Sequence, residues 1–306
     1  MIDMIIAYAL LASGNVANKY ILKSMSPALL VGIRMSVSGF LILLFSVRKS
    51  PRLRWSYLKH DLPILGVISV VTTLLPALLK AFALTYMVPS KQMVIGSIDP
   101  FITAAYAYLL WGEPLSWRKA IGISVGCFGV GISAVTSSPS EQLWGGWWIF
   151  SLPELAVVIA VALGRYGWMV VQSMLKKGRY LPHEITALSM LTSGLLSLGI
   201  SMARGNTLLF TGPTPDNFIS ILLYTTFIGN IGGYTAYSYC LRHHNATVVS
   251  LTGLLMPFFV AFMSWSVGLE VLSWNFFIAM TFLAIGMAIF YSKPRASAAI
   301  SDSSGI

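Results

Sequence analysis

The sequence predicts an all-α polytopic membrane protein with ten transmembrane helices, arranged as two inverted five-helix repeats. Three observations predict this fold class. First, 56% of the 306 residues are hydrophobic and only 10% are charged, whereas soluble proteins are about 25% charged. Second, the apolar runs are each close to ~20 residues long, enough for a helix to cross a hydrocarbon core of about 30 Å. Third, the two halves of the chain resemble each other at one fixed offset.

The repeat is clearest between residues 93–131 and the segment that lies 157 positions later. Each copy has an apolar run with an early proline, a glutamate, the tripeptide Leu-Ser-Trp and a second apolar run. The matching pairs include Gly96 and Gly253, Pro100 and Pro257, Phe101 and Phe258, Ala104 and Ala261, Glu113 and Glu270, Trp117 and Trp274, and Gly129 and Gly286. Because one offset aligns all of them without a gap, the pattern indicates a tandem duplication.

Each repeat is expected to contribute five spans. In the first repeat, over 1–136, the spans are expected at 2–22, 26–47, 62–87, 91–112 and 118–136. In the second repeat, over 152–292, they are expected at 152–175, 184–203, 217–242, 246–268 and 274–292. The Pro/Ser/Trp-rich segment 137–151 is expected to be a periplasmic or extracellular connector. The small, polar tail over 293–306 is expected to be a disordered cytoplasmic segment.

Individual spans have features typical of membrane helices. The N-terminal MIDMII lacks a basic n-region, so it is interpreted as the start of span one and not as a removable signal peptide. The glycines of span five, such as Gly122 and Gly126, allow close helix packing. Trp117 and Trp274 begin their spans and are typical of interfacial anchors.

The distribution of Lys and Arg predicts the orientation. With a cytoplasmic N-terminus, 13 of the 20 basic residues fall in inside loops and the tail, and only Lys19, Lys23, Lys91 and Arg204 lie near the outside. Because positive residues collect on the cytoplasmic side, both termini are expected there. Five spans per repeat is an odd number, so the second repeat enters the membrane inverted. Many secondary transporters have this build, with the substrate site at the repeat interface near the midplane.

Several segments of the first half together resemble the EamA domain of the drug/metabolite transporter superfamily. They are GIRMSVSGFLILL, AFALTYMVPS, IDPFITAAYAYLLWGEPLSW and the Gly-rich span five, with later parts repeated as AYSYCLRHHNATVVSLTGLLMPFF and GLEVLSW. The resemblance covers nearly the whole chain, but Leu191 stands opposite Arg34 and Met256 opposite Asp99. It implies a secondary carrier of small organic metabolites or drugs that works by alternating access. The absence of a G-x-x-x-x-G-K-[ST] motif agrees with transport without ATP hydrolysis.

The opening segment GNVANKYILKSMSPALLVGIRM also resembles a subset of EamA members from host-associated intracellular bacteria. Some members of that subset import S-adenosylmethionine. This resemblance implies a location in a bacterial inner membrane.

Asp99 is the leading candidate for the substrate or coupling site. A charged side chain mid-bilayer costs about 2.5–3.5 kcal/mol on insertion scales, so it requires a partner or a function. Asp99 precedes Pro100, which removes a backbone hydrogen bond and loosens the helix. Its carboxylate could bind a substrate ammonium or a coupling proton, or it could instead pair with Lys80 or Arg34 and lock two helices together. Pro100 and Pro257 are candidate hinges, with simple kinks as the alternative.

Three basic residues lie within spans and are candidates for binding a substrate carboxylate: Arg34, Lys80 and Arg165. The planar fork of an arginine suits a carboxylate, while structural pairing or snorkelling to the surface is the alternative. Four aromatic residues could stack on an adenine or an aromatic amino acid, or could be core and belt residues: Tyr106, Trp168, Tyr234 and Tyr237. Asn15, on the polar face of span one, could line a cavity. Glu113 and Glu270 are interpreted as turn residues before a capping serine.

These features favour a proton-coupled or exchange carrier for a small zwitterionic or cationic metabolite, such as an amino acid or S-adenosylmethionine. The alternative in the same class is a broad-specificity drug or metabolite exporter. An intramembrane enzyme is disfavoured because Ala187 replaces the second histidine of an H-E-x-x-H motif begun at His183. A channel is disfavoured because no filter-like run is present.

The expected partners are the small-molecule substrate and the lipid bilayer. Nucleic acid is not expected, because the basic residues are scattered, and no catalytic residue, metal or cofactor is expected. Cys127 and Cys240 lie inside apolar segments and suggest neither a disulfide nor a metal site. A homodimer is compatible with the sequence, which does not specify one.

Overall fold

The computed structural model describes residues 2–49, 55–112, 115–135, 146–147, 150–176, 182–205, 217–233, 236, 240 and 252–292. Tyr234, Tyr237, Glu113 and the tail over 293–306 therefore lie outside the described residues. Within the described ranges the chain is almost entirely helical. A short antiparallel strand pair, β1 (Gly146–Trp147) and β2 (Phe150–Ser151), precedes the second half.

Seven described helical segments are long and apolar enough to cross a membrane, so the expected all-α polytopic class is confirmed. The helices of the first half are α1 (Ile2–Ile21), α2 (Pro27–Lys49), α3 (Trp55–Ile68), η1 (Ser69–Leu74), α4 (Leu75–Tyr86), α5 (Pro89–Gly96), α6 (Asp99–Trp111) and α7 (Trp117–Val135). Those of the second half are α9 (Leu152–Lys176), α10 (Pro182–Ala203), α11 (Phe218–Tyr224), η2 (Thr225–Gly232), α14 (Leu255–Ser266) and α15 (Trp274–Tyr291). Two apolar segments, Phe218–Gly232 and Leu255–Ser266, are shorter.

Several spans contain irregular backbone. η1 and η2 are π-helical, and η1 shifted by 157 positions falls inside η2. Ser97 and Ile98 separate α5 from α6, directly before Asp99 and Pro100. Proline lacks the backbone donor that a continuous helix needs at this place. The expected loosening of span four at Pro100 is therefore a break in the helix.

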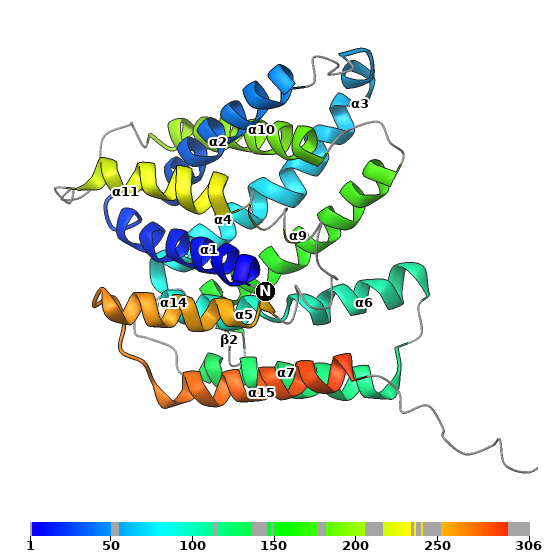
Figure 1. The fold of residues 1–306 in the computed structure, drawn as a ribbon, viewed down its shortest axis with the longest axis vertical. Helices are drawn as coiled ribbons and strands as arrows, with labels where there is room; N and C mark the ends of the chain where they lie inside the picture. Colours follow the sequence, from blue (N-terminus) through cyan, green and yellow to red (C-terminus); the bar gives the residue numbers. More distant parts are fainter. Residues whose placement is uncertain are drawn as a thin grey trace, which may run out of the picture.

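Helices of the two halves pack against each other in matched pairs (Figure 1). α2 packs on α10 and α7 on α15, while α1 contacts η2 and α9 contacts η1. Gly14 of α1 meets Gly229 of η2 so closely that a Cβ there would lie 2.7 Å from the Gly229 Cα. Gly167 of α9 meets Thr72 of η1 in the same way. Thr72 and Gly229 are 157 positions apart and Gly14 and Gly167 are 153 apart, so the two contacts join corresponding helices of the two halves.

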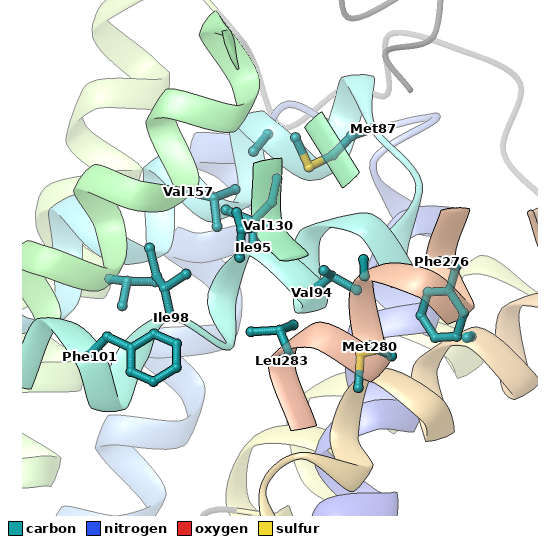
Figure 2. Packing of buried hydrophobic residues seen from close by; sticks show 14 of the residues in the cluster. Met87, Val94, Ile95, Ile98, Phe101, Val130, Val157, Phe276, Met280 and Leu283 are labelled. Carbon is teal, nitrogen blue, oxygen red and sulfur yellow. The ribbon is translucent and has the colours of Figure 1, made fainter. Parts of the chain in front are cut away.

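The largest apolar core joins both halves (Figure 2). Val94 and Ile95 of α5 pack with Val157 of α9 and Leu283 of α15, and all four side chains are fully buried. Inside a membrane such packing holds helices together mainly through van der Waals contact. This core fixes α5, α9 and α15 around the start of α6.

The helices run between two ends of the molecule. The connections 22–26 and 267–273 lie at one end, which we call the Glu270 end. The connection between α6 and α7 and the C-terminus of α15 lie at the opposite end, which we call the Lys119 end (Figure 1). Ser116 and Ser273, as predicted, accept hydrogen bonds from the first turns of α7 and α15.

Candidate functional site

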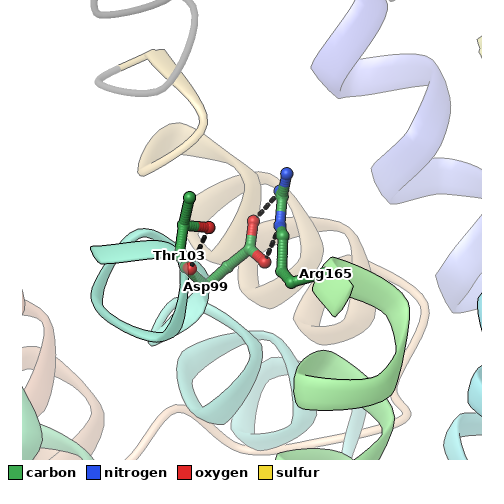
Figure 3. A network of polar contacts seen from close by, with 3 residues as sticks. All are labelled: Asp99, Thr103 and Arg165. Carbon is green, nitrogen blue, oxygen red and sulfur yellow. Dashed lines mark hydrogen bonds and ion pairs between the residues drawn. The ribbon is translucent and has the colours of Figure 1, made fainter. Parts of the chain in front are cut away.

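The centre of the candidate site is a two-bonded ion pair between Asp99 and Arg165 (Figure 3). The Nε and Nη2 of Arg165 each donate to one carboxylate oxygen of Asp99. The Thr103 hydroxyl donates to the Asp99 carbonyl at 2.9 Å. Because the Arg165 and Asp99 side chains are 37% and 27% exposed, a solute can reach the pair. The pair joins α6 of the first half to α9 of the second.

The local sequence explains why a carboxylate is tolerated at this position. Asp99 is the first residue of α6, and its backbone lies at the break that Pro100 imposes. The N-terminus of a helix carries partial positive charge, which stabilises an anion there. A guanidinium offers two parallel donors that match the two carboxylate oxygens. The sequence named both residues as candidates, but it named Lys80 or Arg34, not Arg165, as the structural partner of Asp99.

The ion pair lines a cavity of about 250 Å³. The lining residues come from α6, α7, α9, α15 and the α6–α7 connection: Asp99, Pro100, Thr103, Ala104, Ala107, Leu115, Lys119, Arg165, Phe290 and Tyr291. Lys119 and Tyr291 belong to the Lys119 end, and the Lys119 ammonium lies 6.0 Å from the Phe290 ring centre. The cavity therefore extends from the ion pair toward that end.

Lys80 adds a second positive charge near the pair. It lies within a candidate span and interacts electrostatically with Arg165, but it does not line the cavity itself. Among the described residues, the Lys80 ammonium has no hydrogen-bond or ion-pair partner. Arg165, which binds the Asp99 carboxylate, thus also interacts with a second cation, and this positive charge favours a ligand that brings an anionic group.

Asn15 belongs to a hydrogen-bonded chain that ends at the Lys80 backbone. Its Nδ2 donates to the Gln92 Oε1 at 3.2 Å, and the Gln92 Nε2 donates to the Lys80 carbonyl at 2.6 Å. The Asn15 Oδ1 is buried and has no partner among the described residues. This chain ties α1 and α5 to α4. The sequence did not single out Gln92, which is almost completely buried.

Arg34 lies in a separate polar cluster. Its Nη2 donates to the Asn230 Oδ1 at 2.8 Å, and the Asn230 Nδ2 donates to the Ser38 Oγ at 3.3 Å. The cluster connects α2 to the π-helical η2. Arg34 does not line the cavity that holds Asp99.

The remaining candidates take other positions. The Tyr106 hydroxyl donates to the Ala162 carbonyl at 3.1 Å, and its ring packs edge-on against Tyr166. Trp168 is exposed, and neither Tyr106 nor Trp168 lines the cavity. Of the two candidate hinges, Pro100 lines the cavity, while Pro257 is buried in the first turn of α14.

Two side chains at the Glu270 end make contacts that the sequence did not predict. Glu270 Oε2 accepts a hydrogen bond from the Ser90 Oγ at 2.7 Å and so connects the α14–α15 turn to α5. Lys19, which the sequence places near the outside, donates to the Leu84, Thr85 and Met87 carbonyls at 2.7, 3.0 and 3.0 Å. A cation at the C-terminus of α4 is favourable because the last carbonyls there lack helical partners.

Comparison with known families gives one match over most of the chain. The profile of the EamA-like transporter family matches residues 1–135 and 152–292. A solved crystal structure has a TM-score of 0.63 with this chain at 16% identity, covering 94% of this chain and 96% of the other. That likeness supports the fold.

Several curated proteins match most of this chain. The chain is 26% identical to a Chlamydia muridarum protein named "S-adenosylmethionine/S-adenosylhomocysteine transporter", over 92% of this chain and 88% of the relative. A Chlamydia trachomatis serovar L2 protein of the same name is 26% identical over 92% of this chain and 86% of the relative. A WAT1-related chloroplast protein of Arabidopsis thaliana is 26% identical over 80% of this chain and 58% of its own length.

Proposed function

Because the chain belongs to the EamA-like transporter family, a family of membrane transporters and not of enzymes, we propose that it is a secondary carrier for a zwitterionic metabolite of the S-adenosylmethionine kind. The observation that carries this proposal is the exposed ion pair of Asp99 and Arg165 in a cavity between the two halves. The carrier works by alternating access between the two sides of the membrane.

The proposed architecture is a ten-span inverted repeat, with the repeats over 1–136 and 152–292 and both termini in the cytoplasm. The equivalent contacts of Gly14 with Gly229 and of Gly167 with Thr72 support a pseudo-twofold relation between the halves. The excess of basic residues in the expected inside loops supports the orientation. The Lys119 end is then cytoplasmic, and the proposed location is a bacterial inner membrane.

The ion pair is matched to a zwitterion. Asp99 and Arg165 bind each other through two hydrogen bonds. An α-amino acid group carries one ammonium and one carboxylate, so it can replace both partners at once, its ammonium binding Asp99 and its carboxylate binding Arg165. A ligand with only one charge leaves the other residue of the pair unpaired, which is costly away from water. Lys80 supplies further positive charge for the substrate carboxylate.

The relatives' names suggest which zwitterion this is. S-adenosylmethionine and S-adenosylhomocysteine share an α-amino acid group and an adenosine, and only the first carries a sulfonium. The ion pair recognises the group they share. In this arrangement the adenosine extends past Phe290 and Tyr291 toward the Lys119 end, where aromatic rings can stack on a purine.

A competition assay tests this assignment. Uptake of radiolabelled S-adenosylmethionine is measured in bacterial cells that express the chain, against cells that carry the empty vector. S-adenosylhomocysteine should compete, whereas 5′-methylthioadenosine, which lacks the amino acid group, should not. Equal competition by both compounds would show that the amino acid group is not recognised. Absence of uptake above the vector control would remove this substrate class.

A further inference from the structure

Two helix faces that occupy corresponding positions in the two repeats lie in different environments. On α14, four residues along one face are buried: Pro257, Val260, Ala261 and Ser264. Their counterparts on α6, 157 positions earlier, all line the cavity: Pro100, Thr103, Ala104 and Ala107. One copy of the face is therefore closed off, while the other copy borders open space.

Different neighbours account for this asymmetry. The α14 face is covered by α1, where Ala12 and Val16 pack with Val260 in one apolar cluster. On α6 the corresponding four residues border the cavity instead of an apolar cluster. Among the described residues, α6 meets α9 through the Asp99–Arg165 ion pair and through the hydrogen bond from the Tyr106 hydroxyl to the Ala162 carbonyl. Among the described residues, the Glu270 end is thus closed, whereas the cavity extends toward the Lys119 end.

Polar contacts between the halves add to the closure of the Glu270 end. The Glu270 carboxylate accepts hydrogen bonds from the hydroxyl and the backbone N–H of Ser90, at the start of α5. The N-cap residue of α5, Val88, provides no side-chain cap, so Glu270 caps this helix from the other half of the chain. The Tyr20 hydroxyl donates to the Val267 carbonyl at 2.8 Å beside it.

The surroundings of Glu270 allow this contact to open. Lys19 of α1, Ser90 of α5 and Ser264 of α14 face the carboxyl group. Burial raises the pKa of Glu270 above its ordinary value, although the hydrogen bonds from Ser90 and the charge of Lys19 oppose the shift. The carboxylate is therefore held less favourably here than it would be in water.

We propose that the α14 face is the wall of the substrate path in the opposite conformation, and that the Glu270–Ser90 contact is the latch that closes this path here. When the carrier changes to its opposite conformation, α14 separates from α1 and the Glu270 end opens, while α6 packs more closely against α9. The inference rests on the proposed carrier function and adds the residues that control access from the second side.

Cysteine accessibility tests the latch without requiring a substrate. In a background with Cys127→Ser and Cys240→Ser, single cysteines replace Val260 or its counterpart Thr103. A membrane-impermeant maleimide is applied from each side in oriented membrane vesicles. We expect Thr103→Cys to react from the Lys119 side and Val260→Cys to react slowly from both sides.

Removing the latch should expose the α14 face. Adding Glu270→Ala should raise the labelling rate of Val260→Cys from the Glu270 side by about tenfold, since a charged hydrogen bond contributes about 1.5 kcal/mol or more. Ser90→Ala, which removes the same side-chain bond from the other partner, should act in the same direction. Ser273→Ala is the matched control, because it removes a helix cap of the same connection without touching Ser90.

Three outcomes would overturn the proposal. They are a Val260→Cys rate that neither latch variant changes, an equal increase with Ser273→Ala, and a Val260→Cys that already reacts as fast as Thr103→Cys. If the labelling pattern holds but S-adenosylmethionine is not transported, the substrate assignment fails while the latch stands.

Discussion

Replacing Asp99 by asparagine separates the two roles that an ion pair can have, recognition and structural support. The substitution keeps the size of the side chain and removes its charge, so the Arg165 guanidinium beside Lys80 loses the carboxylate that accepts its two hydrogen bonds. Exposed pairs contribute about 0.2–1 kcal/mol to stability, and removing one partner of a buried pair costs about 3–5 kcal/mol. Because the pair is 27–37% exposed, we expect a loss of about 1–2 kcal/mol.

The effect on substrate is expected to be larger. Loss of a hydrogen bond between charged groups costs about 1.5–3 kcal/mol, which corresponds to about a 10- to 150-fold weaker affinity. The double variant Asp99→Asn/Arg165→Gln removes both charges of the pair, so it should regain most of the thermal stability but not the affinity. Thermal melting and S-adenosylmethionine binding of the purified protein measure the two quantities. If the double variant regained binding together with stability, the pair would be a structural tie and our account of recognition would be wrong.

Four further predictions follow from other contacts. Lys80→Gln should raise the KM for S-adenosylmethionine several-fold with little change in melting temperature, measured by uptake kinetics and thermal melting. Gly167→Ala should destabilise the fold by about 1–3 kcal/mol, because its methyl group would overlap Thr72. Arg34→Ala should lower the melting temperature without changing the ratio of S-adenosylmethionine to S-adenosylhomocysteine uptake, because its partner Asn230 lies outside the cavity. Burial raises the pKa of Glu270 in the closed conformation, and protons favour the conformation with the higher pKa. Acidifying the Glu270 side from about pH 7.5 to 5 should therefore slow the labelling of a cysteine on α14, and Glu270→Gln should remove this dependence.

Much of the fold is predictable from the sequence because membrane helices must satisfy their own backbone hydrogen bonds. Apolar runs of spanning length therefore become helices, and their observed bounds lie close to the expected ones. α1, for example, ends at Ile21, one residue before the expected end. The fixed offset also predicts Ser116 and Ser273 as caps, because a serine before a helix accepts from its first turn.

The candidate site was only partly predictable. Asp99 and Arg165 are identifiable because charges inside spans are costly. Their pairing depends on how α6 crosses α9, which periodicity within one helix does not determine. Gln92 and the contact of Glu270 with Ser90 were missed for the same reason, since both depend on how distant helices pack. A span-end glutamate looks like a turn residue until its partner on another helix is known.

The central claim is that this chain exchanges zwitterions that carry an α-amino acid group across the membrane. Counterflow in proteoliposomes tests it most directly. Vesicles loaded with unlabelled S-adenosylhomocysteine are placed in labelled S-adenosylmethionine without any ion gradient. We predict a transient accumulation of label that Asp99→Asn strongly reduces. Absence of counterflow in the wild-type protein, or undiminished counterflow in Asp99→Asn, would contradict the account.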